Sequence, residues 1–132
     1  MDKHRLKQMI QLCELREQRA STSISKQRAL VRQTALKKSE FAAEVDEYTR
    51  RLDRLTQYKN ETNISGLRNT HLATRWLKYD DEKARYFLQK TDDELVEQTD
   101  EARQLSVSRQ RIRDKRIRFS ELLKDAQRSK SF

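Results

Sequence analysis

Proline is absent from this chain of 132 residues, and glycine occurs once, at Gly66. These two residue types end helices most often, so the one strong breaking point lies near the middle of the chain. Apolar residues are also scarce, at 34% against 39% charged residues. Such a chain has too little apolar surface for a multilayered core, but it is rich in the good helix formers Arg, Lys, Gln, Glu, Leu and Ala. We therefore expect two long helices and one bend.

Cysteine and long apolar runs are scarce as well. The single Cys13 cannot form an intramolecular disulfide, which is typical of a reducing compartment. The amino terminus lacks the apolar run of a secretory signal, and no stretch approaches the length of a membrane span. We expect a cytoplasmic protein that is not inserted in a membrane.

Apolar residues recur at alternating steps of four and three on both sides of Gly66, and we call these positions the seam. The average step of about 3.5 residues is the coiled-coil period, so each half presents one stripe to a single partner helix. Eleven of sixteen seam positions are apolar in the first half, and ten of fifteen in the second. The first half of the seam is Leu6, Ile10, Cys13, Glu17, Ala20, Ile24, Gln27, Val31, Thr34, Lys38, Phe41, Val45, Tyr48, Leu52, Leu55 and Lys59. The second half is Leu77, Asp81, Ala84, Leu88, Thr91, Leu95, Gln98, Ala102, Leu105, Arg109, Ile112, Arg116, Phe119, Leu123 and Ala126.

The predicted fold is all-α: a long antiparallel two-helix coiled-coil hairpin that forms a single domain over residues 1–132. We expect the first helix at about 3–60, a loop at about 61–70 and the second helix at about 71–129. Polar, turn-forming residues surround Gly66 in this loop, and Thr70 is the expected N-cap of the second helix.

The register of the hairpin is predicted from the seam. The better of the two nearest registers also places polar residues opposite each other, Lys38 with Gln98 and Gln27 with Arg109. An alternative register, displaced by one heptad, matches the seam only slightly less well. The better register pairs Phe41 with Leu95, Val31 with Leu105, Ile24 with Ile112 and Cys13 with Leu123.

Charge is unevenly distributed along the chain. Residues 1–38 and 103–132 each carry ten Lys or Arg and three acids, whereas residues 39–102 carry ten Lys or Arg and fifteen acids. An antiparallel hairpin brings the two basic segments together at its open end, where they favour an acidic protein partner. The predicted binding residues of this end are Arg5, Arg16, Arg19, Arg109, Arg111, Arg113 and Arg116.

Three other interpretations of the basic end stay open. A nucleic-acid partner is less favoured, because the chain has no recognition motif and its aromatic residues are not interleaved with the arginines. An anionic lipid surface is less favoured still, because the apolar stripe is already committed to a partner helix. Plain solvation of the chain by Lys and Arg is the third interpretation.

Nothing in the sequence indicates catalysis, so we expect a protein that is not an enzyme and has no cofactor or small-molecule substrate. His4 and His71 lie far apart with no ligand spacing around them, which argues against a metal site. One glycine cannot form a glycine-rich phosphate loop. The acidic run from Asp92 to Glu101 is typical of a solvated helix face.

Aromatic residues gather just after the expected bend and lie off the seam: Trp76, Tyr79, Tyr86 and Phe87. They either fold over Leu55 and Tyr58 at the tip or form a docking patch, because exposed aromatic residues favour interfaces.

Three segments carry a resemblance to a known family, and the resemblance spans the whole chain. They are Leu12 to Ala20 (LCELREQRA), Arg75 to Tyr79 (RWLKY) and Asp114 to Ala126 (DKRIRFSELLKDA). In these segments the chain resembles the central stalk proteins of type III secretion systems, the YscO group of injectisomes and its flagellar counterpart FliJ.

The resemblance implies a stalk analogous to the gamma subunit of rotary ATPases, whose basic end enters a hexameric export ATPase. Its other parts would approach the export gate protein and the secretion chaperones, at the cytoplasmic side of the inner membrane. In flagellar members an apolar pattern that contacts the gate follows the RW..Y segment, whereas Asp80, Asp81 and Glu82 follow Tyr79 here. The implied function is protein transport in virulence, and the alternative is a self-associating coiled-coil adaptor or a nucleic-acid-binding basic rod.

Overall fold

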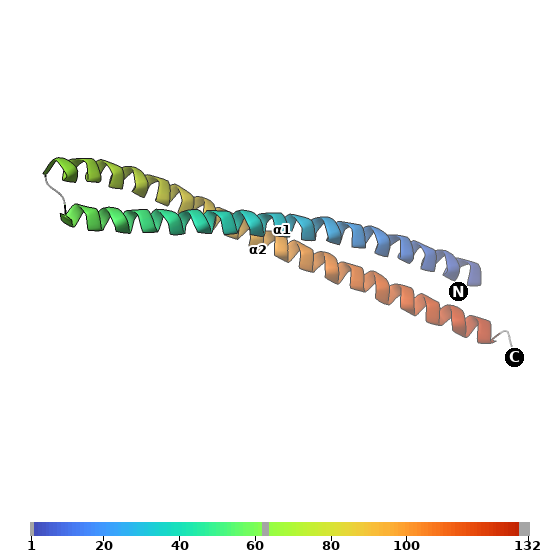
Figure 1. Cartoon of the computed structure of the whole chain (residues 1–132). Coiled ribbons are helices and arrows are strands. Elements are labelled where there is room, and N and C mark those ends of the chain that lie inside the picture. The colour runs from blue at the N-terminus through green and yellow to red at the C-terminus, as the bar shows by residue number, and fades with distance from the viewer. Residues whose placement is uncertain (1, 62–63, 130–132) are drawn as a thin grey trace. The chain divides into compact units, whose positions relative to one another are not determined.

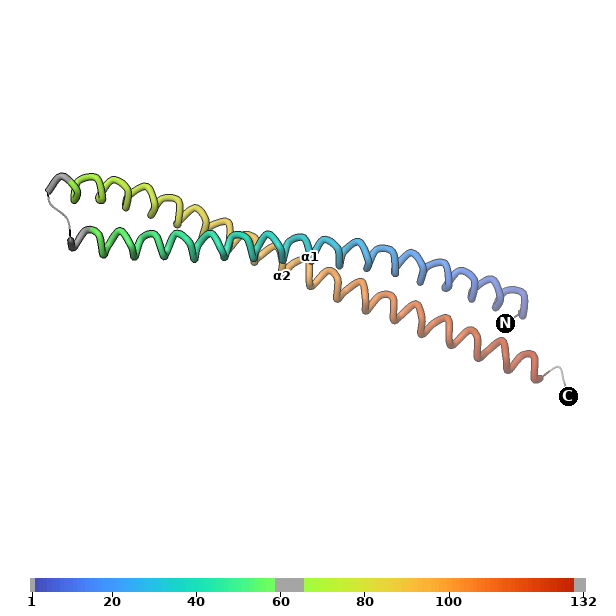
Figure 2. Tube along the Cα trace, in the orientation of Figure 1, coloured from blue at the N-terminus to red at the C-terminus, as the bar shows by residue number. Residues whose placement is uncertain are grey.

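The computed structural model describes residues 2–61 and 64–129, and these residues form two long helices (Figure 1). Helix α1 spans Lys3–Glu61 and helix α2 spans Ile64–Ser129. The trace in Figure 2 follows each of them as a continuous series of turns. The described residues contain no strand, and the predicted all-α class with two long antiparallel helices is confirmed.

Helix α1 begins where the sequence predicts it. The carboxylate of Asp2 accepts a hydrogen bond from the backbone N–H of His4 at 3.4 Å, and its carbonyl accepts from the N–H of Leu6 at 3.0 Å. A carboxylate at this position satisfies a backbone N–H that has no partner inside the helix. The predicted start at residue 3 therefore matches Lys3.

The predicted loop at 61–70 is wrong over most of its length, because α2 already begins at Ile64. Gly66 and Thr70 are helical residues, and Thr70 is not an N-cap. The Thr70 hydroxyl donates to the carbonyl of Gly66, one turn earlier, at 2.7 Å, and the Thr70 side chain is buried. Helix formation lets Thr70 face the other helix with its hydroxyl satisfied, and a single glycine costs only about 1 kcal/mol in a helix. Residues 62–63 of the predicted loop lie outside the described residues.

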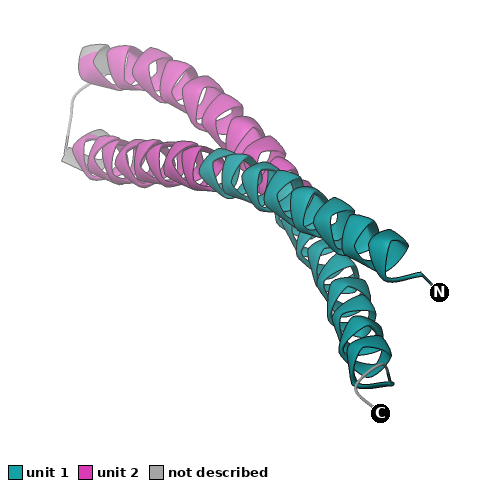
Figure 3. Cartoon of the chain, turned by 90° about the vertical axis from the view of Figure 1, so that its right-hand side faces the viewer, with its two compact units in different colours: residues 1–31, 98–132 teal, residues 32–97 magenta. Residues whose placement is uncertain are grey.

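The chain divides into two compact units, and both helices run through each unit (Figure 3). Unit 1 consists of residues 1–31 and 98–132, and unit 2 consists of residues 32–97. In each unit a segment of α1 packs against an antiparallel segment of α2. The single domain expected over residues 1–132 stays a prediction.

The predicted seam is the buried stripe of both helices. Every seam position whose side chain the structure describes is buried or half-buried, from Leu6 to Leu55 on α1 and from Leu77 to Ala126 on α2. Unit 1 has Leu6, Cys13 and Ile24 as buried apolar residues, whereas unit 2 has Val45 and Ala84 together with Thr34, Thr70 and Thr91. Each core is a narrow layer between two helices, as expected for a coiled-coil pair.

The predicted register is wrong, and the alternative register, one heptad away, fits the contacts. In unit 2, Phe41 stacks on Phe87 with ring centroids 5.7 Å apart. Phe87 directly precedes Leu88, which the alternative register places opposite Phe41, whereas the predicted partner Leu95 lies one heptad beyond Leu88. Displacement by one heptad leaves seam residues facing seam residues, so the apolar pattern fits both registers. Polar contacts therefore decide between the two registers. These contacts are the ion pair of Lys38 with Asp92 at 2.6 Å and the hydrogen bonds from Gln27 to the Gln98 carbonyl and to Glu101.

Candidate functional site

The net charge of the chain belongs to unit 1. Its residues carry seventeen Lys or Arg and eight acids, whereas unit 2 has thirteen of each. The excess of nine positive charges therefore lies in the sequence of unit 1. A field of this kind attracts an anionic partner surface and speeds its association.

Most of the exposed cations of unit 1 lie on one flank of the helix pair. On either helix, residues directly before seam positions face one flank of an antiparallel pair, and residues directly after them face the other. Arg85 and Thr49, which both follow seam residues, contact each other at 3.4 Å, as this geometry requires. Seven exposed cations of unit 1 directly precede seam residues, and we call them the basic flank: Arg5, Arg16, Arg19, Lys26, Arg111, Lys115 and Arg118.

Acids are excluded from the middle of the basic flank. The positions of α2 that directly precede seam residues between Gln104 and Leu122 hold no Asp or Glu. Four of the five arginines of the flank are residues that the sequence predicted for binding, and none of the five makes an ion pair with any residue that the structure describes. Their charges are therefore available to a partner.

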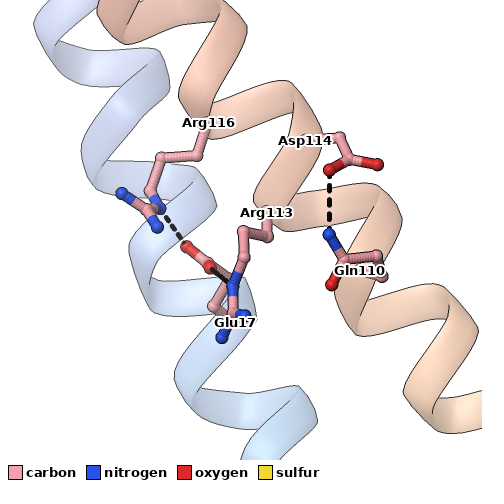
Figure 4. A network of polar contacts seen from close by, with 5 residues as sticks. All are labelled: Glu17, Gln110, Arg113, Asp114 and Arg116. Carbon is pink, nitrogen blue, oxygen red and sulfur yellow. Dashed lines mark hydrogen bonds and ion pairs between the residues drawn. The ribbon is translucent and has the colours of Figure 1, made fainter.

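The other predicted arginines of unit 1 are engaged within the helix pair. Arg113 and Arg116 both reach the carboxylate of Glu17, at 3.4 Å and 2.5 Å (Figure 4). The Glu17 side chain is only 14% exposed, so α2 largely covers this carboxylate. Arg109 is half-buried in the seam. Arg113 and Arg116 therefore support the fold of unit 1, and the structure brings none of these three arginines to the basic flank.

Lys26, Lys115 and Arg118 belong to the basic flank but were not among the predicted binding residues. Their signal was present in the sequence, because each of them stands directly before a seam residue. Sequence position relative to the seam identifies the flank better than the density of arginines along the chain.

The aromatic residues predicted near the tip separate into two groups. Trp76, Tyr79 and Tyr86 are 68%, 59% and 63% exposed, so they do not fold over the helix pair. Phe87 is half-buried against Phe41, and Tyr86 meets its ring edge-on. Phe87 therefore belongs to the core of unit 2.

Leu72 joins the three exposed aromatic residues on one face of α2. It is 50% exposed and lies seven residues before Tyr79, which lies seven residues before Tyr86. Residues seven apart share a helix face, and Trp76 lies one turn from Leu72. We call Leu72, Trp76, Tyr79 and Tyr86 the aromatic patch. Exposed apolar faces of this kind are typical of interaction surfaces.

Over residues 2–61 and 64–129, no three His, Cys, Asp or Glu side chains are grouped so that they could hold a metal ion. Cys13 is a free thiol, and it is 5% exposed in the core of unit 1. In the same described ranges, no helix has a segment both long and apolar enough to cross a bilayer.

Comparison with known proteins gives no relative. No family model matches the chain, and neither a curated protein nor a solved structure matches it.

Proposed function

We propose that the chain is a non-catalytic stalk or adaptor of a type III secretion export apparatus. It couples the hexameric export ATPase to the export gate protein and to secretion chaperones, at the cytoplasmic face of the inner membrane. Unit 1 binds the ATPase through its basic flank, and the aromatic patch of unit 2 contacts the gate or a chaperone. The choice of this apparatus comes from the resemblance to the YscO and FliJ stalk proteins in the three segments quoted above.

The basic flank is the observation that carries this proposal. Seven exposed cations on one side of a helix pair, five of them arginines without an ion pair among the described residues, suit an acidic protein surface. Arginine forks bind carboxylates in bidentate geometry, and complementary charge raises the association rate. The fold also suits a stalk, because two long helices with a narrow core expose most of their other residues to partners.

Charge reversal on the basic flank tests the proposal. The variant Arg16→Glu, Arg19→Glu, Arg111→Glu should bind the purified export ATPase at least about tenfold more weakly at physiological salt. Arg113 and Arg116 are left intact, because their reversal would break the pairing with Glu17 and disturb the fold. Helical circular dichroism should be unchanged.

The matched control changes the charge of unit 2 by the same amount. Arg50, Arg54 and Arg68 are exposed and form no ion pair with a described residue, so their reversal leaves the basic flank intact. We expect ATPase affinity within about twofold of the original chain for this control. Equal loss in both variants would show that net charge alone matters and would contradict a specific binding flank.

The same flank would suit a phosphate backbone, which is the second candidate function. A nucleic-acid-binding protein should retain duplex or single-strand binding at moderate salt, with an affinity that falls steeply as salt rises. Duplex binding at physiological salt, together with no ATPase binding, would favour that candidate over the stalk.

A further inference from the structure

A surface groove of unit 2 is lined by cationic and hydroxyl side chains. It measures about 440 Å³, within the range of roughly 300–1,000 Å³ that is typical of ligand sites. Its lining residues are Leu52 and Thr56 of α1, and His71, Thr74, Arg75 and Lys78 of α2. We call it the cationic groove.

Helix geometry brings the nitrogen-bearing side chains of this groove together. Arg75 lies four residues after His71, and Lys78 lies seven residues after His71. All three side chains therefore project from one face of α2. Each of them is exposed. No carboxylate of a described side chain lines the groove, and neither Arg75 nor Lys78 forms an ion pair with a residue that the structure describes. The groove therefore presents positive charge that the chain itself leaves unneutralised.

Arg75 also belongs to a second groove, which it lines together with Leu72, Trp76 and Tyr79 of the aromatic patch. The cationic groove and the aromatic patch are therefore adjacent surfaces that share one guanidinium. A partner seated here meets positive charge on one side and an apolar, aromatic surface on the other.

We propose that this composite surface docks a segment of another protein that carries acidic side chains beside apolar ones. Carboxylates of the segment pair with Arg75 and Lys78, and its apolar side chains cover Trp76 and Tyr79. Charge-assisted pairing gives the segment its orientation, while burial of the aromatic rings supplies most of the affinity. This inference rests on the proposed function in one respect: that proposal gives the aromatic patch a protein partner, and the inference adds the chemistry of that partner.

A second copy of the chain is the main competing occupant. Asp93 and Asp100 lie about one turn before and after Val96, which is 57% exposed, so the chain itself has an acidic and apolar face. A segment of another protein is favoured because Val96 is the one exposed large apolar side chain of the acidic segment 92–101, and a single valine cannot cover a patch of three aromatic rings. The experiment below separates the two occupants.

Trp76 is the only tryptophan of the chain, so its fluorescence reports on this surface directly. The probe is a synthetic helical peptide with leucines on one face and glutamates along both flanks. The comparison peptides have glutamine or lysine in place of every glutamate. We expect the glutamate peptide to shift the Trp76 emission to shorter wavelength and to saturate, with at least about fivefold weaker binding for the glutamine peptide.

Two matched variants test which cations of the chain give the preference for the glutamate peptide. Arg75→Gln with Lys78→Gln should remove the preference for the glutamate peptide. The control, Arg50→Gln with Lys90→Gln, neutralises two exposed cations of unit 2 that line neither groove and should keep that preference.

Three results would overturn the inference: equal binding of the glutamate and glutamine peptides, an equal loss in the control variant, or an emission shift that follows the concentration of the protein alone. The last result would identify a second copy as the occupant. Export ATPase binding is measured separately for Arg75→Gln with Lys78→Gln and should be unchanged. Failure of the peptide experiment is thus distinguishable from failure of the proposed stalk, which depends on the basic flank of unit 1.

Discussion

The Glu17 carboxylate of α1 faces the Arg116 guanidinium of α2 across the seam of unit 1, with 2.5 Å between Oε2 and Nε. Both positions belong to a stripe that is otherwise largely apolar, and Arg113 shares the same carboxylate. A charge that is largely removed from water is stable only when it is paired. This cluster therefore favours the observed alignment of the two helix segments over alignments that would leave Glu17 unpaired.

Neutralisation of Glu17 should destabilise the chain. Glu17→Gln removes the negative charge from two arginines, one of them only 31% exposed, and we expect the free energy of unfolding to fall by about 1–3 kcal/mol. Urea denaturation followed by circular dichroism measures this change. The control Glu14→Gln alters an exposed acid one turn away, with no ion pair to a described residue, and should stay within about 0.5 kcal/mol. Equal effects of both changes would contradict a special role of Glu17.

Cysteine crosslinking should recover the observed register. In a Cys13→Ser background, cysteines at positions 41 and 87 should crosslink rapidly with a short reagent, because the rings of Phe41 and Phe87 stack at 5.7 Å. Cysteines at 41 and 95, the pair predicted from the seam, should crosslink far more slowly. Mass spectrometry of digested products measures both. Preference for the second pair would restore the register that the sequence predicted.

The periodicity of burial was predictable, and the register was not. Burial of the seam depends on local spacing, and every seam side chain that the structure describes is buried or half-buried. A shift by one heptad returns seam residues to seam residues, so apolar pattern alone hardly distinguishes two registers. The distinction comes from side chains beside the seam, such as Asp92 opposite Lys38 and Glu101 opposite Gln27, which act only once two helices meet.

The candidate site was predicted in composition more than in arrangement. The sequence identified the basic segments and the aromatic cluster, but it grouped Arg113 and Arg116 with the exposed arginines. Their engagement depends on Glu17, which is almost a hundred residues away in sequence. In the same way, Phe87 was grouped with exposed aromatic residues because its stacking partner Phe41 lies on the other helix.

Truncation of an aromatic side chain should lower the free energy of unfolding more in the core of unit 2 than in the aromatic patch. Phe87→Ala removes a half-buried ring that stacks on Phe41, and we expect a loss of about 1–3 kcal/mol in the free energy of unfolding. Tyr79→Ala removes a side chain that is 59% exposed and should cost less than about 0.5 kcal/mol. Urea denaturation of the two variants makes the comparison. A larger loss for Tyr79→Ala would mean that the patch is part of the core.

The thiol of Cys13 should be protected in the folded chain. It is 5% exposed, so a thiol reagent should react with it only when unit 1 opens. Glu17 lies one turn further along α1, and Glu17→Gln should raise the labelling rate by about tenfold, which corresponds to about 1.4 kcal/mol. Glu14→Gln serves again as the control. Labelling of the original chain as fast as in concentrated urea would contradict a buried thiol.

Alanine at position 66 should stabilise the chain. Gly66 lies in the first turns of α2, and no described glycine has a positive φ angle. Alanine therefore fits the backbone without strain and lowers the entropy of the unfolded chain, so Gly66→Ala should raise the free energy of unfolding by about 0.5 kcal/mol. The carbonyl that accepts from the Thr70 hydroxyl is kept in this variant. A left-handed glycine at the bend would give the opposite sign, with a loss of about 1 kcal/mol on substitution. The direction of the shift in thermal midpoint thus decides whether the single glycine of the chain continues a helix or ends one.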